Sequence, residues 1–492
     1  MASTACRAVE ASLFARANFQ DSFQARPVSP AQRAGRLSPE RDALAPDLLA
    51  AVFQLALDQP GCPTCRLLAE RAHKGFWITL WENVTDPGVR GDFRARRGFC
   101  ANHLRGFRAT EIREHLGGTG SAAFLEDLCR AACADLDQAS PAAPIPTCRP
   151  CEADRLSTGT WSDVVVENLR RPVFRAEYTA ADGLCADHAY LALRRARDHH
   201  WAAWLARATA MRARSLAHER IAAMLVDWLL VPSHSRPLGG AMAIDHAPDP
   251  GLLTAEIKRA VAMPGCAICR MAEETEQRVL SNFLREGHAD AGLRARLVDG
   301  PGFCARHGQR LLALEEARFG SGVITAHLLA DVAAVWIKRL EEAAQVFDQL
   351  AAKRAALHPL LRLLRRPAPA PLVPVLHGCY FCGLVQGSAA VASSTYARCL
   401  TRGTFVEAVT SSDGLCLDHL RAVLGAASPV DGRRLAALHA RRLGILAVQL
   451  REYQRKSGWD ARDEPKGPEQ KAPQTAMRFF GGETREPVSC PA

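Results

Sequence analysis

Apolar residues recur along most of the chain at the period of an α-helix. Residues 328–350 carry the clearest stripe, in which apolar side chains follow one another at intervals of three, four or seven positions. Its members are Leu328, Val332, Trp336, Leu340, Phe347 and Leu350. Residues 189–231 show the same periodicity, and the long apolar–polar alternation typical of strands is missing. The pattern predicts an all-α fold built from tandem helical modules.

The apolar pattern does not indicate a membrane span. The two longest apolar stretches are 221–231, which contains Asp227, and 323–336, which contains His327 and Asp331. A helix that crosses a bilayer needs about 20 consecutive apolar residues. The first residues lack the apolar core of a signal peptide, and their Ala, Ser and Arg content favours a disordered start over a transit peptide. The cysteine usage described below, which is typical of a reducing compartment, predicts a cytoplasmic protein.

Segments rich in proline and polar residues divide the 492 residues into pieces of ordinary domain size. The expected linkers are 139–146, 236–251 and 367–374. We expect a disordered start over 1–44 and a disordered tail over 458–492. Between them we expect four helical metal modules, which we call A1 (45–138), B1 (147–232), A2 (252–366) and B2 (375–457).

Twelve of the 17 cysteines belong to one motif that occurs four times, once in each module. Each copy has a Cys-x-x-Cys pair, followed about 35 residues later by Gly, then Phe or Leu, then Cys-x-x-His. The candidate metal ligands are Cys62, Cys65, Cys100 and His103 in A1; Cys148, Cys151, Cys185 and His188 in B1; Cys266, Cys269, Cys304 and His307 in A2; and Cys379, Cys382, Cys416 and His419 in B2.

The spacing separates the four copies into two kinds. In A1 and A2, 35 positions separate the second cysteine from the third, and both share Gly-Phe-Cys-Ala-x-His. In B1 and B2 the separation is 34 positions, and both share Asp-Gly-Leu-Cys-x-Asp-His. This A-B-A-B order predicts that a half with two sites has been duplicated in tandem.

Cysteine pairs accompanied by spaced histidines are typical of metal sites in a reducing compartment rather than of disulfide frameworks. A Cys-x-x-Cys turn aims two thiolates at one ion, and a Cys-x-x-His on a helix places both ligands on one face. We expect the two pairs of each module to meet and complete one Cys3His shell, a structural zinc type. We also expect the glycine before the third cysteine to take a positive φ in a tight turn.

Four zinc ions per chain are therefore the predicted cofactors, with an iron–sulfur cluster as the alternative. A shell of four protein ligands leaves no position for water or substrate, and such closed zinc sites stabilise folds rather than catalyse reactions. The chain also lacks a phosphate-binding loop, a nucleophile elbow and an H-E-x-x-H motif. These observations favour a protein that is not an enzyme.

Other residues have two interpretations that the sequence leaves open. Asp187 and Asp418 directly precede ligand histidines, where they could accept a hydrogen bond from the imidazole or supply favourable charge to a helix's first turn. The net charge is +10, but the arginine clusters at 94–97, 194–197, 362–366 and 441–442 are spread among acids. A solvated surface is favoured over phosphate binding for these clusters.

Five cysteines lie outside the motif, and Cys129 and Cys133 are expected to be buried where their helix packs against another. The five are Cys6, Cys129, Cys133, Cys399 and Cys490.

The first module resembles a bacterial family of unassigned function. The resemblance rests on Cys62-Pro63-Thr64-Cys65 and on Gly98-Phe99-Cys100-Ala101-Asn102-His103. The third module is similar, with Ala267 in place of the proline, and the second and fourth have Leu in place of Phe. The resemblance covers the ligand segments. It implies a soluble bacterial helical protein with Cys/His metal sites and implies no activity.

Four functions are compatible with these features. The first is an interaction or scaffold protein with structural zinc, whose protein partners the sequence does not identify. The second is a thiol-based redox or metal sensor, because clustered thiolates are oxidisable. The third is an iron–sulfur subunit of an oxidoreductase. The fourth is a nucleic-acid-binding regulator, although the sequence contains no recognisable nucleic-acid-binding motif.

Overall fold

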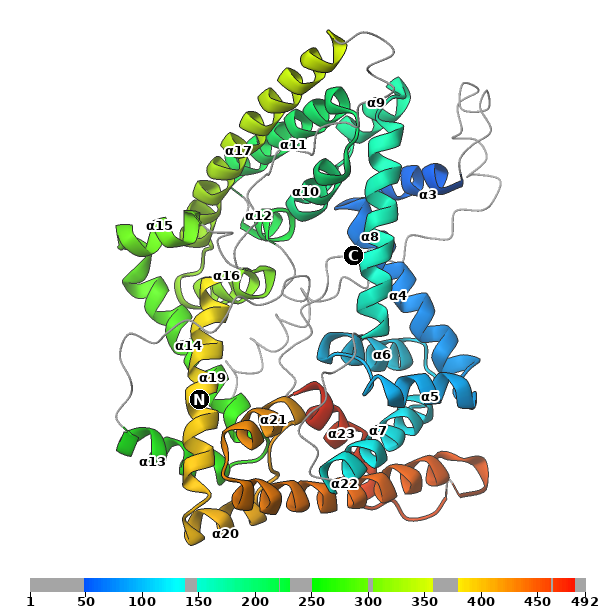
Figure 1. Ribbon diagram of the computed structural model, residues 1–492, viewed down its shortest axis with the longest axis vertical. Coiled ribbons are helices and arrows are strands. Elements are labelled where there is room, and N and C mark those ends of the chain that lie inside the picture. Colours follow the sequence, from blue (N-terminus) through cyan, green and yellow to red (C-terminus); the bar gives the residue numbers. More distant parts are fainter. Residues whose placement is uncertain are drawn as a thin grey trace. The chain divides into compact units, whose positions relative to one another are not determined.

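The structure is a computed structural model that describes residues 48–137, 148–220, 222–230, 250–299, 304–356, 379–461 and 463–482. Over these residues the regular structure consists of 20 α-helices and three short 3-10 helices, with no strand (Figure 1). The all-α prediction is confirmed. Phe53–Ala492 forms one compact unit, and Met1–Val52 is a second unit, of which only the start of α3 (Leu48–Leu57) is described.

The helices of modules A1 and B1 follow one another in the same order. Module A1 contains α3, α4 (Pro63–Trp81), α5 (Pro87–Ala95), α6 (Ala101–Arg113) and α7 (Thr119–Asp137). Module B1 contains α8 (Arg149–Asn168), α9 (Pro172–Ala180), α10 (Ala186–Arg195), α11 (His199–Glu219) and α12 (Ala222–Leu229). In both modules one helix begins after the first cysteine of Cys-x-x-Cys, and another begins after the cysteine of Cys-x-x-His.

Modules A2 and B2 repeat this order of ligand-bearing helices. Module A2 contains α13 (Pro250–Val261), α14 (Ala267–Arg285), η2 (Gly287–Ala289), α15 (Ala291–Asp299), α16 (Ala305–Phe319) and α17 (Val323–Ala355). Module B2 contains α19 (Tyr380–Cys399), α20 (Gly403–Ser411), α21 (Leu417–Ala426) and α22 (Pro429–Ser457). The order of helices is thus common to both halves of the chain, while the tandem duplication and the module boundaries stay predictions.

Local chemistry explains why these helices begin at cysteines. Cys62 and Cys100 have extended backbones (φ −72°, ψ 120° and φ −62°, ψ 162°) and precede the first helical residue of α4 and α6. Proline follows in the first turn of α4 and of α8. The N–H groups of a first turn have no acceptor within the helix, so the missing N–H of proline costs no hydrogen bond there. Cys62 and Cys100 therefore lie directly before the first residue of a helix, at its N-terminal end.

The two halves of the chain contact each other through two pairs of long helices. Helix α7 packs along α22, and α11 packs along α17; both pairs lie side by side in Figure 1. Helices α11 and α17 are antiparallel, because Arg207 contacts Asp348 while Arg214, further along α11, contacts the earlier residue Glu341. Helices α7 and α22 are antiparallel as well, because Glu126 contacts Arg451 while Cys133 contacts the earlier residue Ala440. Each pair joins an A module of one half to a B module of the other.

An apolar core fills the contact between α7 and α22. Leu125, Cys129 and Ala132 of α7 lie in one buried cluster with residues of α22. The contributions of α22 are Leu443, Leu446, Ala447 and Leu450. Polar contacts flank this core, since Arg451 donates to Glu126 at 3.1 Å. Burial of this kind drives the association of helices at roughly 25 cal/mol per Å² of apolar surface.

Part of the expected disordered tail is helical, which corrects the prediction for 458–492. The segment forms η3 (Trp459–Ala461), η4 (Pro468–Lys471) and α23 (Ala472–Gly481). Ala472, Ala476 and Met477 are buried in the same cluster as α7 and α22. The prolines, glycines and charges between 460 and 471 obscured this short apolar face. The expected disordered start over 1–44 and the linkers 139–146 and 367–374 lie outside the described residues, as does most of the linker 236–251.

The prediction about membrane spans agrees with the described helices. Among the residues that the structure describes, no helix combines the length and the apolar character needed to cross a bilayer.

Candidate metal centres

All sixteen candidate ligands come together in four groups, each with three cysteines and one histidine. We call them site 1 (Cys62, Cys65, Cys185, His188), site 2 (Cys100, His103, Cys148, Cys151), site 3 (Cys266, Cys269, Cys416, His419) and site 4 (Cys304, His307, Cys379, Cys382). The ligand atoms of each group lie within 4.8 Å of one another.

The expected grouping of ligands within single modules is wrong. The Cys-x-x-Cys of each A module meets the Cys-x-x-His of the following B module, and the remaining two pairs meet in the same way. Any such combination yields three cysteines and one histidine, so composition and spacing alone could not choose between the two pairings. The consequence is structural, because every site joins an A module to a B module instead of closing one module on itself.

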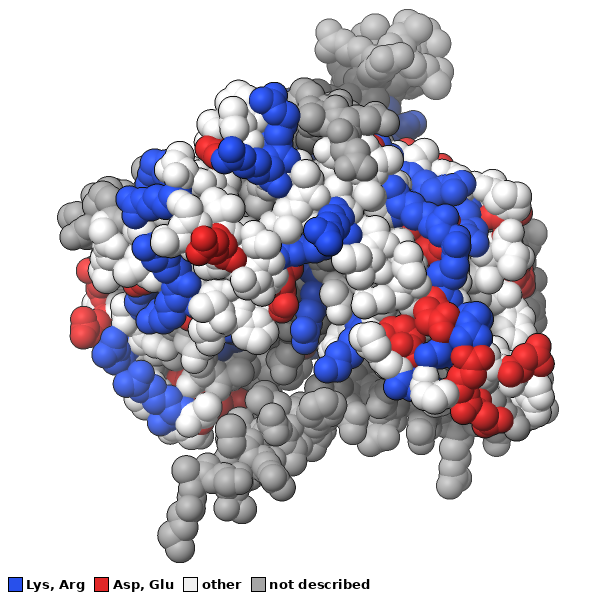
Figure 2. Space-filling model, turned by 90° about the horizontal axis from the view of Figure 1, so that it is seen from below, with Lys and Arg blue, Asp and Glu red and all other residues white. Residues whose placement is uncertain are grey.

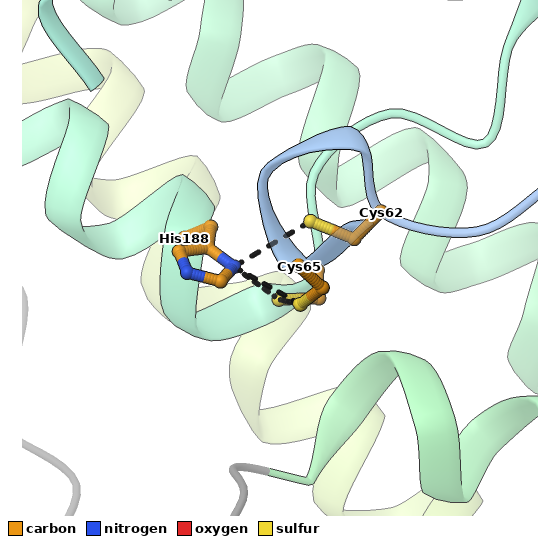
Figure 3. Close-up of side chains that lie close together, drawn as sticks. Cys62, Cys65 and His188 are labelled. Atoms are coloured by element: carbon orange, nitrogen blue, oxygen red, sulfur yellow. Dashed lines mark hydrogen bonds between the residues drawn. The ribbon is translucent and has the colours of Figure 1, made fainter. Parts of the chain in front are cut away.

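Site 1 shows how two distant segments build one group (Figure 3). Cys62 and Cys65 stand at the start of α4, and their sulfurs lie 3.5 and 3.3 Å from Nδ1 of His188 on α10. Cys185, directly before α10, completes the group with its sulfur 3.2 Å from the same nitrogen. The ring nitrogen and the sulfurs therefore point toward a common centre.

The other three groups repeat this geometry. In all four sites Nδ1 of the histidine faces the sulfurs, at 3.2–3.5 Å. One pair of sulfurs in each site is separated by 3.6–3.8 Å.

These distances fit one tetrahedral ion. With Zn–S of about 2.3 Å and Zn–N of about 2.0 Å, a tetrahedron separates two sulfurs by about 3.8 Å and sulfur from nitrogen by about 3.5 Å. A cluster of several irons lies between its ligands and spreads them further apart than a single ion does. The groups therefore have the dimensions of mononuclear sites.

Glycines with positive φ shape the turns before the ligands. Gly98, Gly183 and Gly414 have φ of 83°, 67° and 86°, which confirms the expectation at three of the four positions, while Gly302 lies outside the described residues. Gly61 and Gly265, directly before the two Cys-x-x-Cys pairs of the A modules, also have positive φ (85° and 89°). Side chains with a Cβ rarely adopt this conformation.

An aspartate of each B module holds the turn before the Cys-x-x-Cys of the A module. Asp182 accepts a hydrogen bond from the N–H of Gly61 at 2.7 Å, and Asp413 accepts one from Gly265 at 2.7 Å. The role of these aspartates was not predicted from the sequence. The signal was present, since Asp-Gly-Leu-Cys occurs in both B modules and Pro-Gly-Cys in both A modules.

The carboxylates that contact ligand imidazoles are not the ones that the sequence suggested. Nε2 of His103 lies 3.0 Å from Asp154, and Nε2 of His307 lies 3.2 Å from Glu276. Asp187 and Asp418 stand in the first turns of α10 and α21, and the side chain of Asp418 is exposed. Their positions fit the alternative interpretation, in which the negative charge favours the helix N-terminus.

Charge links the protonation of the groups within a site. Burial lowers the pKa of His103, but the hydrogen bonds that its ring donates to Asp154 and Cys100 outweigh burial and raise the pKa to about 11. Hydrogen bonds from Cys100 and Cys148 raise the pKa of the Cys151 thiol. Neighbouring thiolates repel one another, so each opposes the ionisation of the next. A divalent cation at the centre would compensate this negative charge, and soft thiolates with one imidazole suit zinc.

Cysteines outside the four sites have ordinary packing roles. Cys129 on α7 is fully buried in the cluster that α7 shares with α22 and α23. Burial raises the pKa of its thiol. The thiol of Cys133 lies 3.3 Å from the carbonyl oxygen of Ala440. Cys399 is buried as well, while Cys6 and Cys490 lie outside the described residues.

Comparison with known proteins gives one match. Residues 253–444 match the sequence model of a family of unknown function (DUF6062), which confirms the resemblance to a family without an assigned activity. The matched region contains all eight ligands of sites 3 and 4. No curated protein and no solved structure matches the chain.

Proposed function

We propose that this chain is a zinc-binding helical protein in which four structural ions hold the modules together, and that it serves as an interaction or scaffold protein. The observation that carries the proposal is the spacing of sulfur and nitrogen atoms in four separate Cys3His groups. Each group supplies four protein ligands, which fill a tetrahedral shell and leave no position for substrate.

The positions of the sites support a structural role. The ligands of site 2 come from segments about 50 residues apart, and Cys62 of site 1 lies 126 residues from His188. Sites 1 and 2 both join A1 to B1, and sites 3 and 4 both join A2 to B2. The helix pairs α7–α22 and α11–α17 join the halves. Within each half of the chain, two sites join the A module to the B module. Between the halves, one pair of helices joins B1 to A2 and another joins A1 to B2.

Metal content and coordination test the proposal together. Elemental analysis of the full chain should find four zinc ions per chain, and the protein should be colourless. Replacement by Co²⁺ should give the intense visible bands of tetrahedral thiolate coordination, and added azide or cyanide should leave these bands unchanged because no position is open. Bands that shift on addition of these anions would indicate an open, catalytic type of site. A chain with iron, or with no metal, would contradict the proposal.

Chelation tests whether the ions stabilise the fold. Small zinc peptides gain on the order of 10 kcal/mol of apparent folding free energy from one ion. Removal of zinc should therefore lower the helical circular dichroism signal and the unfolding midpoint, and zinc added back should restore both. An unchanged signal after complete removal of the ions would assign them another role.

A redox or metal sensor is the second candidate function. Five ligand cysteines are only partly buried, namely Cys62, Cys100, Cys151, Cys304 and Cys382. Oxidants of small size can reach such thiolates, and oxidation of one ligand would release the ion. Titration with peroxide in the presence of a zinc-sensitive dye tests this function. Zinc release at oxidant levels that leave the helical signal intact supports it, and release only on denaturation rejects it.

Nucleic-acid binding has less support from the described surface. On the face drawn in Figure 2, Lys and Arg side chains are interspersed with Asp and Glu. Arg96 and Arg97 form ion pairs with Asp92 and Asp135 at 3.0 and 2.7 Å. Arg195 pairs with Asp163, whereas the cluster at 362–366 lies outside the described residues. Affinity for DNA or RNA that falls steeply with salt would favour this alternative.

A further inference from the structure

Two of the four ligand histidines contact a carboxylate through the nitrogen that faces away from the sulfurs. At site 2, Nε2 of His103 lies 3.0 Å from Oδ2 of Asp154, and Arg71 donates to Oδ1 of the same carboxylate. The ring thus presents Nδ1 to three sulfurs and donates its Nε2–H to Asp154. The guanidinium of Arg71 compensates the carboxylate charge.

Site 4 also places a carboxylate beside the outward nitrogen of the ligand histidine, but as an ion-pair contact without hydrogen-bond geometry. Nε2 of His307 lies 3.2 Å from Oε1 of Glu276, and Arg306 donates to Oε2 of that carboxylate at 2.8 Å. Arg310 also donates to Glu276, at 3.4 Å. The side chain of Glu276 is fully buried, so the charges that lie beside this carboxylate include the imidazole and the two arginines.

The two carboxylates are not copies of one repeated position. Asp154 lies on α8, three residues after Cys151, and the corresponding residue after Cys382 is the buried Val385. Glu276 lies on α14, seven residues after Cys269, and the corresponding residue after Cys65 is Ala72. The same contact is therefore made from helices of different modules, which indicates that the contact itself matters at sites 2 and 4.

Sites 1 and 3 are built differently. Within the part of the chain that the structure describes, no Asp or Glu forms an ion pair with His188 or His419. The aspartates beside these two sites, Asp182 and Asp413, instead accept backbone N–H groups before the Cys-x-x-Cys pairs. The four sites thus form two classes, and each half of the chain has one site of each class.

We propose that sites 2 and 4 bind zinc more tightly than sites 1 and 3, and that Asp154 and Glu276 are positioning residues that cause the difference. This inference rests on the proposed zinc-binding function. A carboxylate behind a ligand imidazole fixes the ring orientation and the tautomer, and it increases the basicity of the ligating nitrogen. Loss of such a partner lowers metal affinity roughly 10–100-fold. The chain would then hold two ions firmly and two that exchange more readily.

Equilibrium competition with chelators of graded affinity tests the inference on the zinc-loaded full chain. Two ions should transfer to a weaker chelator, and the other two only to one that binds zinc roughly 10–100-fold more tightly. Asp154→Asn should move one ion from the tight to the weak class, and Glu276→Gln should move another. The double variant should have four weak ions. A general loss of stability would instead weaken all four sites together.

Two control variants lie on the same helices as the positioning residues. Asp163 on α8 pairs with Arg195, and Glu274 on α14 pairs with Arg259, away from any ligand. Asp163→Asn and Glu274→Gln should leave both classes unchanged.

A spectroscopic readout separates positioning from a structural role. In the Co²⁺-substituted chain, the shifted Nε2–H protons of His103 and His307 should exchange slowly with water, and the Asn or Gln variant should accelerate the exchange at its own site. Four ions of equal affinity, or a tight class that survives both variants, would overturn the inference and leave the proposed function intact. Fewer than four zinc ions per chain would overturn the proposed function itself.

Discussion

The backbone N–H of Gly61 donates a hydrogen bond of 2.7 Å to Oδ2 of Asp182, although 121 residues separate the two in the sequence. Gly265 makes the same hydrogen bond to Asp413 across 148 residues. In both cases the donor directly precedes a Cys-x-x-Cys and the acceptor belongs to Asp-Gly-Leu-Cys. The hydrogen bond therefore connects the same two motifs whose cysteines share a site.

Replacement of Asp182 by alanine should destabilise the zinc-loaded chain. The variant loses a charged acceptor for the Gly61 N–H together with the ion-pair partner of Arg212, and hydrogen bonds to charged groups contribute about 1.5–3 kcal/mol. Denaturant unfolding followed by circular dichroism measures the difference. Asp187→Ala is the matched control, because Asp187 in the first turn of α10 supplies helix-end charge, for which the expected loss is about 1 kcal/mol or less. Equal losses in the two variants would show that the contacts of Asp182 with Gly61 and Arg212 do not stabilise the chain in solution.

The packing of α7 on α22, which joins the two halves, should contribute to the free energy of unfolding. Leu125 on α7 is 1% exposed and packs in the cluster that includes Leu443 and Leu450 of α22. Leu125→Ala should lower the free energy of unfolding by about 2–5 kcal/mol, because it removes buried methyl groups and leaves a cavity. Leu156 on α8 is 62% exposed, so Leu156→Ala should have little effect on the same measurement. A small effect at both positions would argue against close packing of α7 on α22.

The sequence predicted the helical class and the sixteen candidate ligands but not their grouping. Helical periodicity and ligand spacing are local properties, and they were sufficient for elements such as α17 and for the Cys-x-x-His turns. Which Cys-x-x-Cys meets which Cys-x-x-His depends on contacts between segments that are 45 or more residues apart, as for Cys148 and His103 or for Cys65 and Cys185. Any Cys-x-x-Cys could combine with any Cys-x-x-His to give three cysteines and one histidine, so the local sequence does not indicate which two meet.

The carboxylates behind His103 and His307 were also beyond local reasoning. Asp154 and Glu276 lie outside the repeated ligand motif, and only tertiary packing brings them to an imidazole. Asp182 and Asp413 were more accessible to sequence reasoning, because both B modules have aspartate two positions before the leucine. The helical tail was missed for a compositional reason, since prolines and charged residues surround the ten residues of α23.

Helix α23 should detach when its buried face carries a charge. Ala476 is fully buried against α7 and α22, and an unpaired carboxylate there would cost roughly 3–5 kcal/mol. Ala476→Asp should therefore make residues 472–481 cleavable by protease under native conditions and lower the unfolding midpoint. Thr475→Asp is the control, because the neighbouring Thr475 is exposed on the same helix. If both variants resist protease like the parent chain, the tail does not pack as described.

Histidine 439 should make stability depend on pH. His439 is 1% exposed on α22; its Nδ1–H donates to the carbonyl of Leu435 at 3.0 Å, and its Nε2 accepts the N–H of Leu415, also at 3.0 Å. Burial lowers the pKa of His439 from 6.5 to about 4. Protonation would remove the acceptor for Leu415, the residue directly before Cys416.

The sign of the pH effect follows from the lowered pKa. Between pH 6.5 and about 4 the unfolded chain binds a proton at His439 that the folded chain does not, so the contribution of His439 is fully present above pH 6.5 and declines as the pH falls through this window. The loss approaches about 3 kcal/mol near pH 4. His439→Gln retains an acceptor for Leu415 but cannot titrate. Because thiolate protonation and metal release affect both proteins alike, the difference between their unfolding free energies at pH 7 and pH 5 isolates His439. Identical pH slopes in the two chains would show that His439 does not titrate as a buried neutral group.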